Sequence, residues 1–277
     1  MREARGVCQA AGMLQDLGRS RDRPAPPPPG LADPPGPSPL DGPPVTTIEE
    51  VVQRQREVQR HLLRTAPRRG RDGLACFNYL YRIITEDVLA KTLAADFFED
   101  NEFLVELDVA FANRYFAALR AHERGLVVPE AWKALLSARN RSRVAAVRFA
   151  IAGVNAHVNY DLPFALVTAV EKLGRPLEHG THRADYERIN RIFAFHMCGL
   201  RQHFQTQRER RVDDVLFGRL ANFAGDRAVD WARDLAWINA EIIWDRRRDP
   251  RFVRSQDRRL DRFAGWLGQA LLVPVPV

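Results

Sequence analysis

A polar motif interrupts one of the most apolar segments of this 277-residue chain. The motif runs from Asn155 to Pro163, with the sequence NAHVNYDLP, and lies between the apolar stretches 144–154 and 164–170. Flanks of this composition predict a helix that is apolar around most of its circumference and is therefore buried. A buried helix needs neighbours on every side, so we expect the other elements to surround it.

The polar residues of this central helix are predicted to form two ridges. At about 100° per residue, His157 and Asp161 lie one turn apart on one side, whereas Arg148, Asn155 and Asn159 lie on roughly the opposite side. Buried polar groups require hydrogen-bond partners. The two ridges therefore predict contacts with at least two neighbouring elements.

Pro163 predicts an irregularity within the same helix. It has no backbone N–H to donate to the carbonyl of Asn159, and its ring crowds that carbonyl. A kink or break near Tyr160 follows, with a backbone acceptor left free. Helix irregularities are common at functional sites, so the polar motif is the first candidate for a site.

Helical periodicity also governs the rest of the chain, and no segment shows the alternation of a half-buried strand. We predict an all-α fold, a single bundle of about eight helices. Besides the central helix, a short amphipathic helix is expected to end near Gly225, and the others are expected at 46–63, 72–95, 101–123, 130–138, 185–207, 226–248 and 250–271.

The first 45 residues differ in composition from the rest. They contain the run 26–29 of four prolines and further prolines up to position 44, with few aromatic or β-branched residues. Such a segment cannot bury enough apolar surface to fold. We therefore predict a disordered, proline-rich tail over 1–45 and one helical domain over 46–273.

Targeting signals and membrane spans are not evident. Charged residues interrupt any secretory signal near Met1, and the longest uncharged run, Phe263 to Val277, is too short for the roughly 20 apolar residues of a span. Three distant cysteines argue against a disulfide framework. We expect a cytoplasmic protein.

The chain is basic, with a formal net charge of +7. A nucleic-acid partner would need a recognisable basic motif or face, and arginines crowd at 246–262. However, arginine is spread over nearly every predicted helix, and no nucleic-acid-binding motif accompanies it. We therefore do not expect a nucleic-acid partner.

Asp108 breaks the pattern of the predicted helix 101–123. It falls within an apolar stripe that includes Leu104, Leu107 and Phe111, where an apolar side chain is expected. A carboxylate in such a place must be paired, hydrogen-bonded or bound to a metal ion. Asp108 is thus a second candidate site residue.

Five residues form the candidate catalytic set. His157 could act as a general base whose tautomer is held by Asp161, with Asp108 as the second acidic group. Asn155 and Arg114 could position a substrate. An equally open interpretation is that Asp108, Arg114, Asn155 and Asp161 form a buried structural network that fixes helix register.

A divalent metal ion is the candidate cofactor. His157, Asp161 and Asp108 could ligate it together with Glu241, which lies beside an apolar edge of the helix 226–248 between Trp237 and Trp244. A metal held in this way could activate water for hydrolysis. Glu241 could instead be an exposed glutamate that pairs with a nearby arginine.

Several spaced motifs of the chain resemble a known family. These are FN-x-LY at 77–81, LD-x-x-FANRY at 107–115, G-x-NAH-x-N-x-DLP at 153–163 and W-x-NAE at 237–241. Together they resemble a bacterial all-helical family known only as a domain of unknown function, over about Thr46 to Leu272. The resemblance implies no activity, substrate or site residue.

The working hypothesis is a small-molecule enzyme with a buried His/Asp/Asn site, with metal-dependent hydrolysis as one form of its chemistry. The alternative is a non-catalytic protein, either a scaffold or a ligand-binding bundle with a pocket walled by Tyr160, Trp237 and Trp244. The sequence leaves the reaction, the ligand and the oligomeric state open.

Overall fold

The computed structural model describes residues 38–66, 72–94, 96–204 and 226–273, with the backbone alone at 198–204 and 226–229. The expected short helix ending near Gly225 and most of the expected tail lie outside these residues. Every regular element within them is a helix, which confirms the predicted all-α fold. No described helix combines the length and apolar character needed to cross a lipid bilayer.

Three consecutive helical segments within residues 146–173 form one continuous helix, and with these counted as one the described residues contain eight helices, as predicted. The helices at 101–123, 130–138 and 250–271 have the predicted bounds. In chain order the elements are α2 (Ile48–Thr65), α3 (Gly73–Leu93), α4 (Asn101–Glu123), α5 (Glu130–Ala138), α6 (Ala146–Ala156), the π-helical η2 (His157–Asp161), α7 (Leu162–Leu173), α8 (His182–Phe204), α10 (Asp226–Asp245) and α11 (Pro250–Leu271).

Side-chain caps determine where several helices begin. Asp72 and Asp100 accept backbone N–H groups in the first turns of α3 and α4, as N-cap carboxylates commonly do. At α2 the cap is Thr47, whose hydroxyl accepts from the N–H of Glu50 at 3.2 Å, while the Glu50 carboxylate accepts from the N–H of Thr46 at 2.7 Å. The helix α2 therefore begins at Ile48, two residues after the predicted start at 46.

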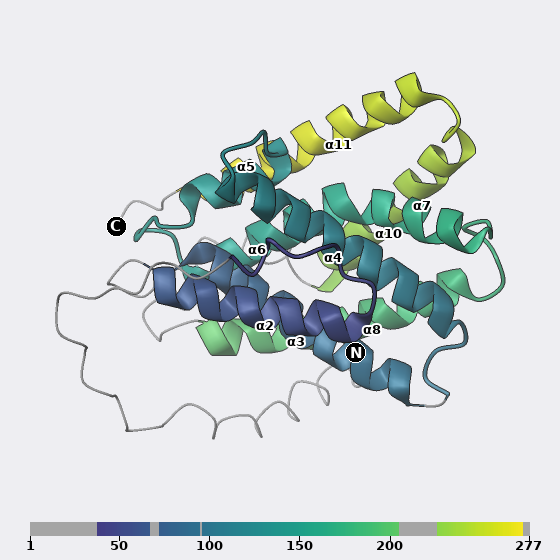
Figure 1. Ribbon diagram of the computed structural model, residues 1–277, viewed down its shortest axis with the longest axis horizontal. Helices are drawn as coiled ribbons and strands as arrows, with labels where there is room; N and C mark the ends of the chain where they lie inside the picture. Colours follow the sequence, from purple (N-terminus) through teal and green to yellow (C-terminus); the bar gives the residue numbers. More distant parts are fainter. Residues whose placement is uncertain (1–37, 67–71, 95, 205–225, 274–277) are drawn as a thin grey trace.

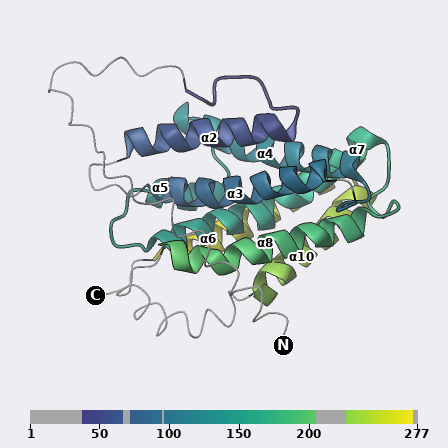
Figure 2. The same ribbon diagram turned by 90° about the horizontal axis from the view of Figure 1, so that it is seen from below.

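The continuous helix α6–η2–α7 occupies the centre of the bundle, as predicted. Its segments contact α3, α4, α5, α8, α10 and α11. Figure 2 shows α2 along one edge of the bundle and α8 with α10 at the opposite edge. In Figure 1, α5 and α11 lie side by side along a third edge. This arrangement explains why the central segment is apolar on most sides.

The chain immediately before α2 is part of the packed domain. The side chains of Leu40 and Val45 are buried in the core. Arg120 of α4 donates to the carbonyl of Leu40 at 2.7 Å, and the side chain of Asn113 exchanges two 2.9 Å hydrogen bonds with the backbone of Val45. Residues 38–45, which composition assigns to the tail, thus belong to the folded unit.

Two glycines allow α3 and α6 to approach closely. A Cβ atom on Gly153 would lie 2.2 Å from the ring of Phe77, and one on Gly73 would lie 2.4 Å from the ring of Phe149. Both rings are buried and cannot easily move. Glycine at these positions therefore places Phe77 directly against the central helix, beside the polar motif.

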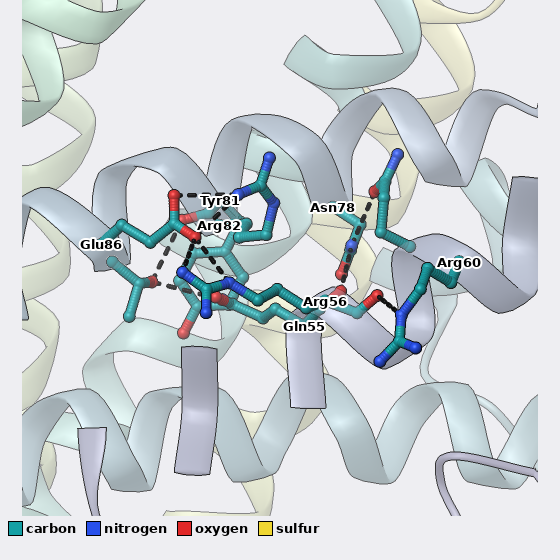
Figure 3. Close-up of polar contacts among 9 residues, drawn as sticks. Gln55, Arg56, Arg60, Asn78, Tyr81, Arg82 and Glu86 are labelled. Carbon is teal, nitrogen blue, oxygen red and sulfur yellow. Dashed lines mark hydrogen bonds and ion pairs between the residues drawn. The ribbon is translucent and has the colours of Figure 1, made fainter. Parts of the chain in front are cut away.

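A buried polar seam joins α2 to α3 (Figure 3). The amide of Asn78 donates to the carbonyl of Gln55 at 3.0 Å and to the side chain of Gln59 at 2.8 Å. Its oxygen accepts from the hydroxyl of Tyr115 on α4 at 3.1 Å. Asn78 thus links three helices and satisfies the only polar group of Tyr115.

The same seam continues toward the surface. Glu86 of α3 accepts two hydrogen bonds from Arg82, at 2.7 and 2.9 Å, and pairs with Arg56 of α2 at 2.9 Å (Figure 3). Because these groups are partly exposed, the pairs contribute little to stability. Their main effect is to fix the register between α2 and α3.

Candidate functional site

The irregularity expected from Pro163 is a π-helical turn, η2. The N–H of Leu162 donates to the carbonyl of His157, five residues earlier, in the pattern of a π-helix. The extra residue lets the chain pass Pro163 and continue directly into α7 instead of ending. The turn holds His157 at its start and Asp161 at its end.

Asp161 is a buried carboxylate, 1% exposed, whose two oxygens accept three hydrogen bonds. Oδ1 accepts from Nε of Arg114 at 3.2 Å, and Oδ2 accepts from Nε1 of Trp132 at 2.9 Å and lies 3.0 Å from Nδ1 of His157. The partners come from α4, α5 and η2. Asp161 therefore connects three elements and has no oxygen without a partner.

His157 is held in one tautomer by this carboxylate. Because Asp161 can only accept, Nδ1 of His157 carries the proton, and in the neutral ring Nε2 is an acceptor. Nε2 is buried and has no hydrogen-bond partner among the described residues. Burial lowers the pKa of His157, although its hydrogen bond to Asp161 opposes this effect. The ring is thus a neutral base at pH 7.

Aromatic rings fix the plane of the imidazole. The ring of Phe111 stacks on it, with centroids 3.4 Å apart and an interplanar angle of 6°. Tyr81 contacts it edge-on at 4.6 Å and Phe77 at 5.8 Å. Since the stack and the Asp161 bond restrain different rotations, Nε2 has one fixed direction.

His157 lines a cavity between α3, α4, α8, α10 and the central helix. The cavity offers about 50 Å³ to the centres of water-sized molecules, where a single water needs roughly 10–15 Å³ on that measure. Its walls are mainly apolar, formed by residues such as Leu80, Ile84, Val88, Leu107, Val158 and Phe193. It can therefore hold a small organic molecule.

Asp108 lines the same cavity and has an uncompensated carboxyl group. Its Oδ2 is sealed from solvent and has no hydrogen-bond partner among the described residues. Burial raises the pKa of Asp108 from 3.8 to about 7, because a charged carboxylate is poorly solvated there. Near pH 7 a large fraction of the group is therefore the neutral carboxylic acid, which can donate a proton.

The other two predicted catalytic residues do not line the cavity. Asn155 faces α11, where it donates to the carbonyl of Ala264 at 2.8 Å and accepts from Asn159 at 3.0 Å. Arg114 pairs with Asp161 and lies over the rings of Tyr160 and Phe164, at 5.2 and 4.8 Å. Of the five predicted catalytic residues, His157 and Asp108 thus line the cavity. Asp161 and Arg114 support His157, and Asn155 contacts α11.

The four predicted metal ligands are not gathered into one site. No group of three or more histidine, cysteine, aspartate and glutamate side chains within the described ranges is arranged to hold a metal ion. Asp161 is fully engaged, and Glu241 accepts from Nε1 of Trp237 at 2.6 Å, away from the cavity. The helical spacing of His157 and Asp161 suggested two ligands, but their side chains bond to each other instead.

Tyr160, Trp237 and Trp244, the expected walls of a binding pocket, do not line this cavity. Trp237 packs on Tyr186 of α8, and Trp244 lies under the guanidinium of Arg247. The aromatic walls come instead from Phe77, Tyr81, Phe111 and Phe193.

Sequence reasoning missed three functional candidates. Trp132 donates to Asp161, Tyr81 places a buried hydroxyl without a partner at the cavity, and Arg233 lines it from α10. Tyr81 and Trp132 look like ordinary core residues in the sequence. No sequence pattern distinguishes Arg233 from the many other arginines of the chain.

The chain matches the model of a known family. The model of a family described as a family of unknown function (DUF5995) matches residues 48–274. No curated protein and no solved structure matches the chain. The matched range agrees with the span expected from the sequence motifs, about Thr46 to Leu272.

Proposed function

The chain belongs to this family of unknown function, and from the geometry of the cavity we propose that it is an enzyme that transfers protons on a small carbonyl compound. One observation carries the proposal. Nε2 of His157, a fixed basic nitrogen, and the carboxyl group of Asp108 line one mainly apolar cavity, and Nε2 and Oδ2 of Asp108 lack a protein partner in the described residues. A base and an acid that share a cavity are suited to general acid–base catalysis.

In the proposed reaction, Nε2 of His157 takes a proton from the carbon next to the substrate carbonyl. The C–H bond breaks, its electron pair forms the new C=C bond, and the carbonyl oxygen receives the proton of Asp108. The product is an enol, and the reverse steps restore both residues. A buried carboxylic acid that stays neutral is suited to stabilise the developing oxyanion.

Supporting residues keep this base in place. Asp161 orients His157 and stabilises the imidazolium that forms when Nε2 takes the proton. Arg114 and Trp132 in turn hold Asp161. The proposal does not use the predicted metal site or Asn155.

Deuterium exchange tests the proposal without knowledge of the natural substrate. Small ketones and oxo acids are incubated with the protein in D₂O, and NMR follows loss of the proton signal next to the carbonyl. We expect exchange above the buffer rate, at least a 100-fold loss in His157→Gln, and no effect of a metal chelator. A folded His157→Gln variant with full exchange would sink the proposal.

His196→Gln is the matched control. His196 also pairs with a carboxylate, with Nε2 at 3.0 Å from Asp87, but it does not line the cavity. We expect exchange in this variant to equal that of the parent protein. An equal loss in both variants would mean that the effect is not specific to the cavity.

The second candidate function is non-catalytic binding of a small apolar ligand. The predominance of apolar side chains in the cavity wall favours it, since ligand pockets generally have this character. It predicts saturable binding of small carbonyl compounds, followed by NMR of the Trp132 indole N–H, with no deuterium exchange in any of them.

A further inference from the structure

Arg233 is a buried cation at the cavity, within reach of the charges of Asp230 and Asp234 but in ion-pair contact with neither. Its side chain is 3% exposed, and it lines the cavity from α10. Its Nε donates to the neutral side chain of Asn190, and its guanidinium lies over the ring of Tyr186 at 4.7 Å. It forms no ion pair with a carboxylate of the described residues. A buried charge in this state is costly unless a partner binds it.

Arg183 on α8 shows what a paired arginine looks like in the same neighbourhood. Its guanidinium also lies over the ring of Tyr186, at 5.7 Å. Unlike Arg233, it pairs with Glu187 at 2.9 Å and with Asp234 at 2.6 Å. Asp234, which follows Arg233 on α10, is therefore engaged by Arg183.

Arg233 is the one cationic side chain among the described residues that line this cavity. At pH 6.5 the tyrosine and the histidine of the wall, Tyr81 and His157, are neutral, and Asp108, with a pKa of about 7, is mostly protonated. The cavity therefore carries a net positive charge. Inside an apolar cavity such a charge favours an anionic group strongly, because water screens it little.

Arg233 and His157 line the same cavity from two elements, α10 and the central helix. The positive charge of Arg233 is one of the causes that lower the pKa of His157, so the two side chains are near each other. The rest of the wall is mainly apolar. A molecule with an apolar middle section could contact both side chains.

We propose that Arg233 binds a carboxylate group of the ligand, so that the substrate class is a small oxo acid with an apolar segment between its carboxylate and its carbonyl group. This inference rests on the proposed function for the role of the carbonyl. An arginine is suited to the task because its planar guanidinium binds a carboxylate through two parallel hydrogen bonds.

Paired ligands test the inference. The probes are 4-oxopentanoate, 5-oxohexanoate and 6-oxoheptanoate, each beside its neutral amide of the same shape. Binding to the full chain is measured by calorimetry at pH 6.5 in 0.5 M NaCl, where surface ion pairs are screened. We expect at least one acid to bind tenfold or more tightly than its amide.

Two substitutions assign that preference to a residue. Arg233→Met keeps the length of the side chain and removes its charge, so the acid and the amide should bind equally. Arg183→Met is the matched control and should keep the preference. Arg233→Met also loses the hydrogen bond to Asn190, so thermal unfolding of the same samples should show that the variant is folded.

A third variant covers a failure of Arg233→Met to fold. Arg233→Lys keeps the charge but loses the planar pair of donors, and it should weaken the acid several-fold while leaving the amide unchanged. Equal binding of acids and amides by the parent protein, or an undiminished preference in a folded Arg233→Met or Arg233→Lys variant, would overturn the inference.

The exchange experiment separates this inference from the proposed function. Deuterium exchange without a preference for the acids would leave the proton-transfer function standing and remove the role of Arg233. Tight binding of the acids without exchange would keep the carboxylate site and remove the catalytic function. The absence of any binding would remove both.

Discussion

Asp108 should make the protein less stable as pH rises. Its pKa is about 7 in the folded chain instead of 3.8, so between these values the folded state binds more protons than the unfolded state, and the free energy of unfolding falls with increasing pH. Asp108→Asn mimics the neutral acid. We expect it to raise the free energy of unfolding at pH 8 by roughly 2–4 kcal/mol and to change it little at pH 4.

Urea unfolding of the parent and Asp108→Asn across pH 4 to 8 measures this difference. His157 contributes with the opposite sign, because its lowered pKa makes the folded state lose stability as pH falls below 6.5. Comparison of the two proteins cancels that contribution, since both contain His157. Identical pH dependence in the two would contradict the assigned state of Asp108.

Asp161→Asn tests the residue that holds the base His157 in place. The variant should lose about 3–5 kcal/mol of stability, because it removes the charge that Arg114 and His157 bind and presents an amide N–H₂ group to existing donors. Glu187→Gln is the control, since its pair with Arg183 is exposed and should contribute less than about 1 kcal/mol. Chemical denaturation gives both values, and a similar small loss in both variants would argue against a central role for Asp161.

At the scale of single residues, the sequence was informative where a polar residue breaks an apolar pattern. That rule identifies His157, Asp161 and Asp108. It does not identify Arg233 or Trp132, because no pattern separates a buried arginine from a solvated one or an indole that donates from one that only packs. The same rule identifies Asn155, but this residue donates to a backbone carbonyl of α11 and does not line the cavity. The rule finds buried polar side chains but does not predict their partners.

At the scale of elements, the close approach of α3 and α6 depends on Gly153. Gly153→Ala places a methyl group against the ring of Phe77, so it should cost roughly 1–3 kcal/mol, as overpacked cores do. In the double variant with Phe77→Leu, the smaller side chain leaves room for the added methyl group, so part of the lost stability should be recovered. A double-mutant cycle by thermal or urea unfolding measures the coupling, and strict additivity would contradict it.

Helix positions were largely predictable at this scale because caps and periodicity are local. The type of irregularity was not. Pro163 predicts that the α-helical pattern fails, but a kink, a break and a π-helical turn all relieve the same clash. Packing by α3, α4, α10 and α11 around the central helix favours the solution that keeps it continuous, and that packing cannot be read from the segment itself.

At the scale of the whole molecule, the chain before α2 should contribute to stability. Leu40 is 2% exposed, so Leu40→Ala should cost about 2–5 kcal/mol by loss of burial and by the cavity left behind. Leu126→Ala is the control, because Leu126 is 62% exposed and its truncation should be nearly neutral. Equal unfolding midpoints for the two variants would show that residues 38–45 do not belong to the folded unit.

The boundary of the domain could not be predicted from composition. Prolines continue to position 44, and a proline-rich segment reads as tail whether or not it packs. The decisive contacts are long-range hydrogen bonds to Arg120 and Asn113, which no local signal reveals.

The π-helical turn also changes the phase of the central helix. It contains one residue more than a regular α-helical path, so the faces of α7 are rotated by about 100° relative to a continuation of α6. A helical wheel drawn with one period through 146–173 therefore assigns residues after Asp161 to the wrong sides. The two helices of this segment thus turn different faces to the same neighbours, and the one extra residue of the turn sets the offset between those faces.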